Sequence, residues 1–472
     1  MTGHAAQRVG ALGGTPGRRS LVGCARLLGG VAARGGCVNP GAAPPDGELN
    51  FPLDLTLGPR DLEGSADTLF VVNSNFNLRY NTATLLALDL DEIHREIDDC
   101  EAEGLLDDNT CVLAPLPGDL AESPALLDEV GISTLTDGLA LGSPAANGAP
   151  SATRIYLAAR ADQNLNFVDF TGQAFSCDQE LPTQSSAVIP ICGERFRTTD
   201  VSPRDTELMG DPVDVLTAPL RSLGVDREGD AIVLTLREGS LALFVDDGGP
   251  EDRPRLLSTV DVGVDDLVTS TLEPDTGLVW VASADSSALI QVGVFLDPLD
   301  LDLSFLSLEG TVDLRDAGAD DGDDTRQILF EPDSTRLWAL NRRPEAVFGL
   351  DQGVPPPQFG GVTLYKVFEV ALGPSRMAIG TLGGRDYLFV TSFQAQRLFV
   401  IDLDLGDLVA VVGGLSGPFG VLVDEARQYV YLTDFASSVI RFIDVAPLTE
   451  TRTPVRRARL GPIQTVQFLG NN

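Results

Sequence analysis

The sequence predicts an all-β protein made of repeated four-stranded units that share one core. Two segments near the C-terminus, Tyr387–Asp402 and Tyr429–Asp444, have the same pattern. Each has a short run of β-branched and aromatic residues, a polar turn, and a second such run that ends in Asp. This pattern is typical of a β-hairpin. A hairpin that recurs along a chain indicates a repeat architecture.

Five weaker copies of the hairpin precede these two. They begin with the runs Leu69–Asn73, Ile155–Ala159, Ala231–Thr235, Leu278–Ser283 and Leu337–Asn341. Further apolar runs precede most hairpins, as at Gln327–Glu331 and Phe419–Asp424, and Asp407–Val412 follows the sixth hairpin. Each unit therefore has about four strands, and the seven units predict a seven-bladed β-propeller.

The repeats indicate one domain over residues 51–472, although the length alone would suggest more. Burying the large apolar side chains of one unit returns roughly 8–15 kcal/mol. Ordering its ~40 residues costs on the order of 1–2 kcal/mol each. A single unit therefore cannot fold alone, and the units must pack on one another.

Residues 1–50 do not have the pattern of a folded segment. Residues 1–36 contain Arg18 and Arg19 before a mildly apolar stretch, which resembles a secretory signal. Cys37 follows it where a bacterial lipoprotein would be lipidated, although Arg26 and Arg34 depart from that pattern. We expect a leader over 1–36, a flexible linker over 37–50, and export to the periplasm or outer surface. A plain signal peptide and a disordered tail are the alternatives.

Four cysteines lie beyond the leader, in two local pairs. Cys100 and Cys111 form the first pair, and Cys177 and Cys192 form the second. Structural disulfides are the expected use. Metal binding is the rival, but the chain has no CxxC pair and His94 is the only histidine beyond the leader.

Uneven spacing of the hairpins predicts two long insertions between blades, at about 92–152 and 172–228, each with one cysteine pair. In the first, Leu90, Ile93, His94 and Ile97 follow helical spacing and predict a short helix. Long loops on rigid scaffolds commonly carry function. The two insertions could therefore form one partner-binding surface, or they could cap the propeller.

The charge of the chain limits its partners. The formal net charge is −36, from 69 acidic and 33 basic residues. Such a surface repels nucleic acid and anionic lipid headgroups. We expect a monomer with an unknown protein or small ligand as partner, and membrane contact only through a lipid anchor. The acidic stretch Asp313–Asp324 could bind Ca²⁺, but it lacks the EF-hand pattern, so we expect a solvated loop and no cofactor.

The last two hairpins resemble the YVTN-type β-propeller repeat, in which a Tyr-Val-Thr-Asn-like strand precedes a strand ending in Ile-Asp. The resemblance covers about residues 51–470 and is loose in the middle units. It implies a seven-bladed propeller, commonly exported in bacteria. It implies no single activity, because the family includes lactonase-like enzymes and surface-layer proteins.

No catalytic motif is present. The chain has no GxSxG, P-loop or CxxCH sequence, and His94 is the only general-base histidine available. Asn73, Asn341 and Asp434 could serve metal-assisted lactone hydrolysis, but bonds to turn backbone are the simpler role. The Asp at each hairpin end recurs in nearly every unit, which indicates a structural role. These residues are Asp89, Asp169, Asp246, Asp351, Asp402 and Asp444.

The sequence thus favours a binding or scaffolding propeller of the cell envelope. A lactonase-like hydrolase and a cell-surface structural protein are the alternatives.

Overall fold

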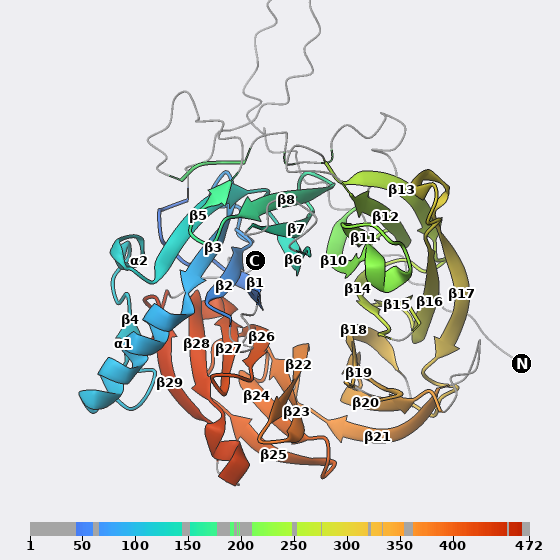
Figure 1. Cartoon of the computed structure of the whole chain (residues 1–472). Coiled ribbons are helices and arrows are strands. Elements are labelled where there is room, and N and C mark those ends of the chain that lie inside the picture. The colour runs from blue at the N-terminus through green and yellow to red at the C-terminus, as the bar shows by residue number, and fades with distance from the viewer. Residues whose placement is uncertain are drawn as a thin grey trace, which may run out of the picture. The chain divides into compact units, whose positions relative to one another are not determined.

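Seven sheets form a ring around a common centre, here called the channel, as the sequence predicts (Figure 1). This computed structural model describes residues 44–59, 66–143, 152–176, 189–192, 196, 198, 210–247, 253–274, 276–319, 322–332, 334–353, 362–450 and 453–464. The predicted leader over residues 1–36, with Cys37, lies outside the described residues.

Each blade is built from four strands that follow one another outward from the channel. The innermost strands are β1 (Pro52–Leu57), β6 (Thr136–Leu141), β10 (Pro212–Pro219), β14 (Leu267–Leu272), β18 (Asp323–Phe330), β22 (Pro374–Leu382) and β26 (Pro418–Asp424). The second strands are β2 (Thr68–Asn73), β7 (Thr153–Ala159), β11 (Asp230–Leu236), β15 (Leu278–Ser283), β19 (Arg336–Arg343), β23 (Arg385–Ser392) and β27 (Tyr429–Asp434).

The outer half of each blade contains the remaining strands. The third strands are β3 (Ala83–Asp89), β8 (Asn164–Phe170), β12 (Ser240–Asp246), β16 (Ala288–Phe295), β20 (Glu345–Asp351), β24 (Arg397–Asp402) and β28 (Val439–Asp444). The outermost strands are β5 (Leu126–Ile132), β9 (Phe175–Ser176), β13 (Arg255–Asp261), β17 (Phe305–Asp313), β21 (Thr363–Glu369), β25 (Asp407–Val412) and β29 (Val455–Leu460).

The seven predicted hairpins are the second and third strands of the seven blades. Both strands are almost fully buried because neighbouring blades cover the two faces of each sheet. Aromatic side chains fill the space between blades, as where the ring of Phe70 meets that of Phe170 at 5.1 Å. Neighbouring blades therefore share their cores.

All seven innermost strands change register near their first residues, for example between Pro52 and Asp54. One or two residues at this point have no partner on the second strand. Such β-bulges redirect side chains. Here the redirected side chains surround one end of the channel.

The first insertion lies within blade 1, not between blades as the sequence predicts. It comprises residues 90–125, which connect β3 to β5, so the predicted 92–152 connection also includes the strands β5 and β6. The insertion contains α1 (Leu90–Ala102), β4 (Val112–Leu113) and α2 (Asp119–Glu122). The expected helix is thus confirmed, with Leu90, Ile93 and Ile97 on its buried face.

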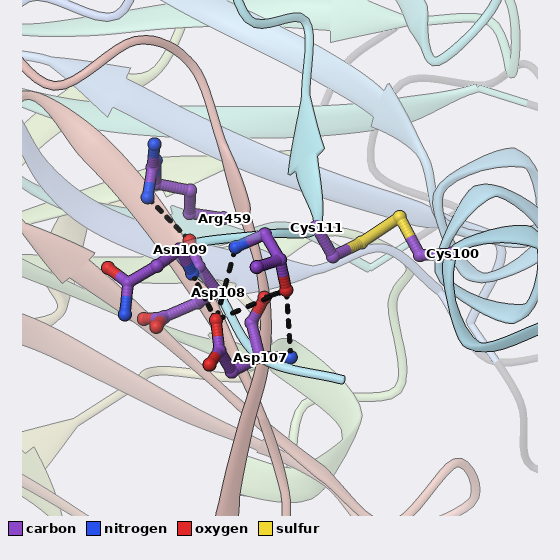
Figure 2. Close-up of a disulfide and its surroundings, with 7 residues drawn as sticks. Cys100, Asp107, Asp108, Asn109, Cys111 and Arg459 are labelled. Atoms are coloured by element: carbon purple, nitrogen blue, oxygen red, sulfur yellow. Dashed lines mark hydrogen bonds between the residues drawn. A yellow bond between two sulfur atoms is a disulfide. The ribbon is translucent and has the colours of Figure 1, made fainter. Parts of the chain in front are cut away.

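The first insertion packs on blade 7 and reinforces the closure of the ring, where β1 also packs on β26. The strand β4 pairs in parallel with β29, and α1 packs on Tyr431 and Phe442. The predicted disulfide Cys100–Cys111 joins α1 to the segment before β4, with a Cα–Cα distance of 5.6 Å (Figure 2). These contacts favour the capping role for this insertion.

The predicted second insertion, residues 172–228, also includes β9 of blade 2 and β10 of blade 3. Its described residues between these two strands pack on blades 1 and 2. Ile191 bridges to Gly131 of β5, and the ring of Phe196 lies 5.3 Å from that of Phe167 in β8. Cys192 is buried and disulfide-bonded. Its predicted partner Cys177 lies outside the described residues, so this pairing stays a prediction. The partner-binding surface expected of the two insertions stays a prediction, because residues 177–188 and 199–209 lie outside the described residues.

The packed structure begins before residue 51. Leu49 is buried, and the backbone N–H of Gly47 donates to Glu129 of β5 at 2.7 Å. In the part of the chain that the structure describes, no helix is long and apolar enough to cross a membrane.

Candidate functional site

A cavity of about 380 Å³ lies at the end of the channel where the seven β-bulges meet. All seven blades contribute to it. The lining residues are Leu53, Phe76, Asp137, Arg160, Val213, Arg237, Val268, Arg326, Arg342, Gly373, Arg376, Phe393, Gln394, Phe419 and Phe435. Five arginines thus face one cavity in a chain with only 33 basic residues.

Two rings of equivalent positions place these side chains. The first ring is the β-bulge, where six of the seven blades contribute Leu53, Asp137, Val213, Val268, Arg326 and Phe419. The second ring lies on the second strands. In each blade, one second-strand residue forms the last pair before the bulge, and the residue after it belongs to this ring. It consists of Ser74, Arg160, Arg237, Ala284, Arg342, Phe393 and Phe435.

Three of the five arginines are neutralised by aspartates. Arg160 donates to both oxygens of Asp211 at 2.6 and 2.7 Å, and to Asp137 at 3.0 Å. Arg237 lies 3.3 Å from Asp211 and 3.5 Å from Asp266. Arg326 pairs with Asp324. Charge-assisted contacts of this kind fix a guanidinium in place.

The other two arginines contact backbone carbonyls instead. Arg342 donates from Nε to the carbonyl of Pro374 at 2.9 Å. Arg376 donates from Nη1 to the carbonyl of Ser375 at 3.2 Å. Among the described residues, no carboxylate lies within 4.0 Å of either guanidinium. Most of their N–H donors therefore remain available to a ligand.

The surroundings of Arg342 are electropositive. Burial, together with the nearby charges of Arg326 and Arg376, lowers the pKa of Arg342 to about 10, and the charge of Asp324 opposes this shift. A bound anion would offset the repulsion among the three cations.

Phenylalanines form a second wall of the cavity. Phe435, in a 3₁₀ turn at Phe435–Ser437, is 5% exposed and lies at the centre of this group. Its ring centroid is 5.7 Å from that of Phe76, 6.0 Å from Phe393 and 6.2 Å from Phe419. The guanidinium of Arg376 lies 4.9 Å from the centroid of Phe419, so it joins the basic wall to the aromatic wall.

A smaller polar cavity of about 150 Å³ adjoins the first, and Asp137 and Arg376 line both. Asp54 and Asp214 line the smaller one. Asp214 accepts from the backbone N–H of Ser270 in the next blade at 2.7 Å. Burial raises the pKa of Asp54 to about 6, although the charge of Arg376 opposes this. These two carboxylates bind backbone N–H groups of neighbouring blades and line the smaller cavity.

The three sequence candidates for lactone chemistry do not line the cavity. Asn73 accepts from the backbone N–H of Asn50 at 3.2 Å, and Asn341 donates to the carbonyl of Gly322 at 2.7 Å. Asp434 accepts from Ser416 N–H at 2.6 Å and from Arg441. All three side chains bind backbone groups or a buried arginine. This is the simpler of the two roles that the sequence suggests for them.

His94 lies on α1, far from the channel in the ring (Figure 1). Its Nε2 is 2.8 Å from the hydroxyl of Tyr431, and its ring meets that of Tyr429 edge to face. Burial lowers its pKa to about 4. His94 therefore packs as a neutral side chain in the first insertion.

The remaining predicted residues have structural contacts. Asp313 pairs with Arg315, and Asp324 with Arg326, whereas Asp320 and Asp321 lie outside the described residues. Within the described ranges, no group of three His, Cys, Asp or Glu is placed to hold a metal. The hairpin-end aspartates cap turns or pair with arginine, as where Asp89 caps α1 and Asp444 accepts from Arg457.

Sequence reasoning missed the channel arginines because they come from four different blades, which lie far apart in the sequence. The signal that finds most of them is positional. When the seven units are aligned, the second ring contains three arginines and two phenylalanines, where a turn would ordinarily show Gly, Asn or Asp.

No family model matches this chain, and no curated protein matches it. A Lactobacillus plantarum protein of solved structure is 12% identical with a TM-score of 0.48, covering 88% of this chain and 97% of that one. A putative 6-phosphogluconolactonase from Bacteroides fragilis is 12% identical with a TM-score of 0.49, covering 84% and 91%. The β-propeller domain of Myceliophteria thermophila Cps50 (Swd1) is 8% identical with a TM-score of 0.49, covering 84% and 98%. At these values the likeness carries no argument about function.

Proposed function

We propose that this propeller is a non-enzymatic binding protein that holds a small anion in its channel cavity. One observation carries the proposal. Arg342 and Arg376 face the cavity, and no carboxylate among the described residues lies within 4.0 Å of either guanidinium. A cavity of about 380 Å³ is within the size range of small-molecule sites.

Thermal melting and calorimetry with acetate, phosphate, sulfate and citrate test this function. We expect at least one anion to raise the melting temperature of the wild-type protein. The double variant Arg342→Gln/Arg376→Gln should lose that shift. Arg221→Gln is the matched control, because Arg221 is 63% exposed and pairs only with the exposed Glu228. An equal shift in the double variant would show that the anion binds elsewhere.

Lactone hydrolysis is the competing function, and the same proteins test it. Wild-type protein incubated with γ-butyrolactone, with and without Ca²⁺, should release no hydroxy acid above the buffer rate. Release that disappears in the double variant would replace the binding function with a catalytic one.

We also propose that the protein belongs with the exported YVTN-type propellers. The Tyr387–Asp402 and Tyr429–Asp444 repeats support this, as does the leader that precedes Cys37. Mass spectrometry of protein from the native membrane fraction should find a mature N-terminus at Cys37. Intact Met1 in a cytoplasmic fraction would contradict export.

A further inference from the structure

We propose that the bound anion is an organic monocarboxylate with an apolar, aromatic-sized body. Its carboxylate would lie between Arg342 and Arg376, and its body would lie on the wall around Phe435. This inference rests on the proposed anion site and specifies its ligand class.

The basic wall has room for one negative charge. Arg342 and Arg376 offer free N–H donors in a planar fork that matches a carboxylate. Arg160, Arg237 and Arg326 are already paired with aspartates. Asp137 lines the same cavity and would repel a second negative group.

The aromatic wall selects for an apolar body. Phe76, Phe393 and Phe419 surround Phe435 with centroid distances of 5.7, 6.0 and 6.2 Å. Phe76 is 53% exposed, so it presents apolar surface that a ligand can cover. Covering such surface stabilises the complex by about 25 cal/mol per Å². An inorganic anion gains nothing from this wall.

The two walls are adjacent because Arg376 contacts both of them. Its guanidinium lies over the ring of Phe419 at 4.9 Å while its remaining donors face the cavity. A ligand whose carboxylate binds Arg376 therefore has its next carbons beside the phenylalanines. A short amphipathic acid meets both requirements.

Calorimetric titration of the full chain with four probes tests the ligand class. The probes are 3-phenylpropanoate, its neutral amide 3-phenylpropanamide, acetate and phosphate. We expect 3-phenylpropanoate to bind at least tenfold more tightly than each of the others. The amide lacks the charge, and acetate lacks the body.

One variant and its control measure the contribution of the aromatic wall. Phe76→Ala should weaken 3-phenylpropanoate about fivefold and leave acetate and phosphate unchanged. Phe305→Ala is the matched control, since Phe305 is 49% exposed on the outer strand β17. We expect no change in this control.

The outcomes distinguish the two proposals. Phosphate or acetate binding as tightly as 3-phenylpropanoate would overturn the ligand class and leave the anion site standing. Equal binding of the amide would overturn the role of the charge. If none of the probes binds in the millimolar range and no anion shifts the melting temperature, both proposals fail.

Discussion

The arginines at the blade boundaries differ in their charge surroundings from two arginines at the channel mouth, Arg342 and Arg376. Arg154 of β7 is fully buried, and it donates to Asp169 at 2.7 and 2.9 Å and to Asp246 at 2.7 Å. Arg441 of β28 likewise binds Asp434 and Asp108. Arg342 and Arg376 contact only carbonyls and one ring within the described part.

This difference separates structural arginines from ligand-facing ones. At the blade boundaries the carboxylates outnumber the guanidinium, since Asp230 also lies close enough to Arg154 and Asp246 to feel their charges. At the channel mouth positive charge is in excess around Arg342. The first arrangement stabilises the ring, and the second is the basis of the proposed anion site.

The largest effect is expected from Arg154→Met. The change leaves Asp169 and Asp246 buried without their cation, which costs about 3–5 kcal/mol in comparable cases. Urea denaturation followed by circular dichroism should show this loss, while Arg221→Gln stays close to wild type. A loss below about 1 kcal/mol would mean that the two classes of arginine do not differ as described.

A second, smaller loss is expected when the disulfide is removed. Cys100→Ser/Cys111→Ser should lower the free energy of unfolding by about 2–4 kcal/mol. Asp108, the partner of Arg441, lies between the two cysteines, so the loss should be less than additive with Arg441→Met. It should be additive with Arg154→Met. Full additivity with both would show that the disulfide does not position Asp108.

A pH-dependent effect is expected from Asp230→Asn. Burial raises the pKa of Asp230 from 3.8 to about 6, and one oxygen is buried without a hydrogen-bond partner among the described residues. A raised pKa means that the folded state keeps a proton that the unfolded state has released. The stability from this group is therefore complete below pH 3.8 and is lost as the pH rises to about 6.

Asp230→Asn should therefore be more stable than wild type at pH 8 by about 1–3 kcal/mol, and the gain should vanish at pH 3.5. Denaturation midpoints at both pH values measure this. Asp404→Asn, which removes an exposed charge, should show no such dependence. A gain that is the same at both pH values would contradict the assignment.

The smallest effect on stability is expected from Arg342→Gln. This change removes a desolvated cation that has no carboxylate partner among the described residues. The free energy of unfolding should change by less than about 1 kcal/mol, whereas anion binding falls at least tenfold. A loss as large as that of Arg154→Met would make Arg342 structural.

The blades could be predicted from the sequence because each hairpin carries its own local pattern. Tyr387–Asp402 contains most of β23 and all of β24. The apolar run Asp407–Val412, which the sequence predicts to be a strand, is β25. Helix α1 and the Cys100–Cys111 disulfide were also predictable, since both depend on local spacing.

The channel site could not be predicted in the same way. Arg160, Arg342 and Arg376 come from three blades and become neighbours only when the ring closes. The place of the first insertion was equally hidden, because nothing local to β4 indicates that it pairs with β29.

Ring closure between blades 1 and 7 also determines when the protein can finish folding. His94 and its partner Tyr431 are separated by 337 residues. A ribosome adding roughly 5–20 residues per second makes the second of these about 20–70 s after the first. During that time the apolar face of α1, with Ile93 and Ile97, has no blade 7 to cover it. The contact between blades 1 and 7 is thus the last joint of the ring that can form during synthesis.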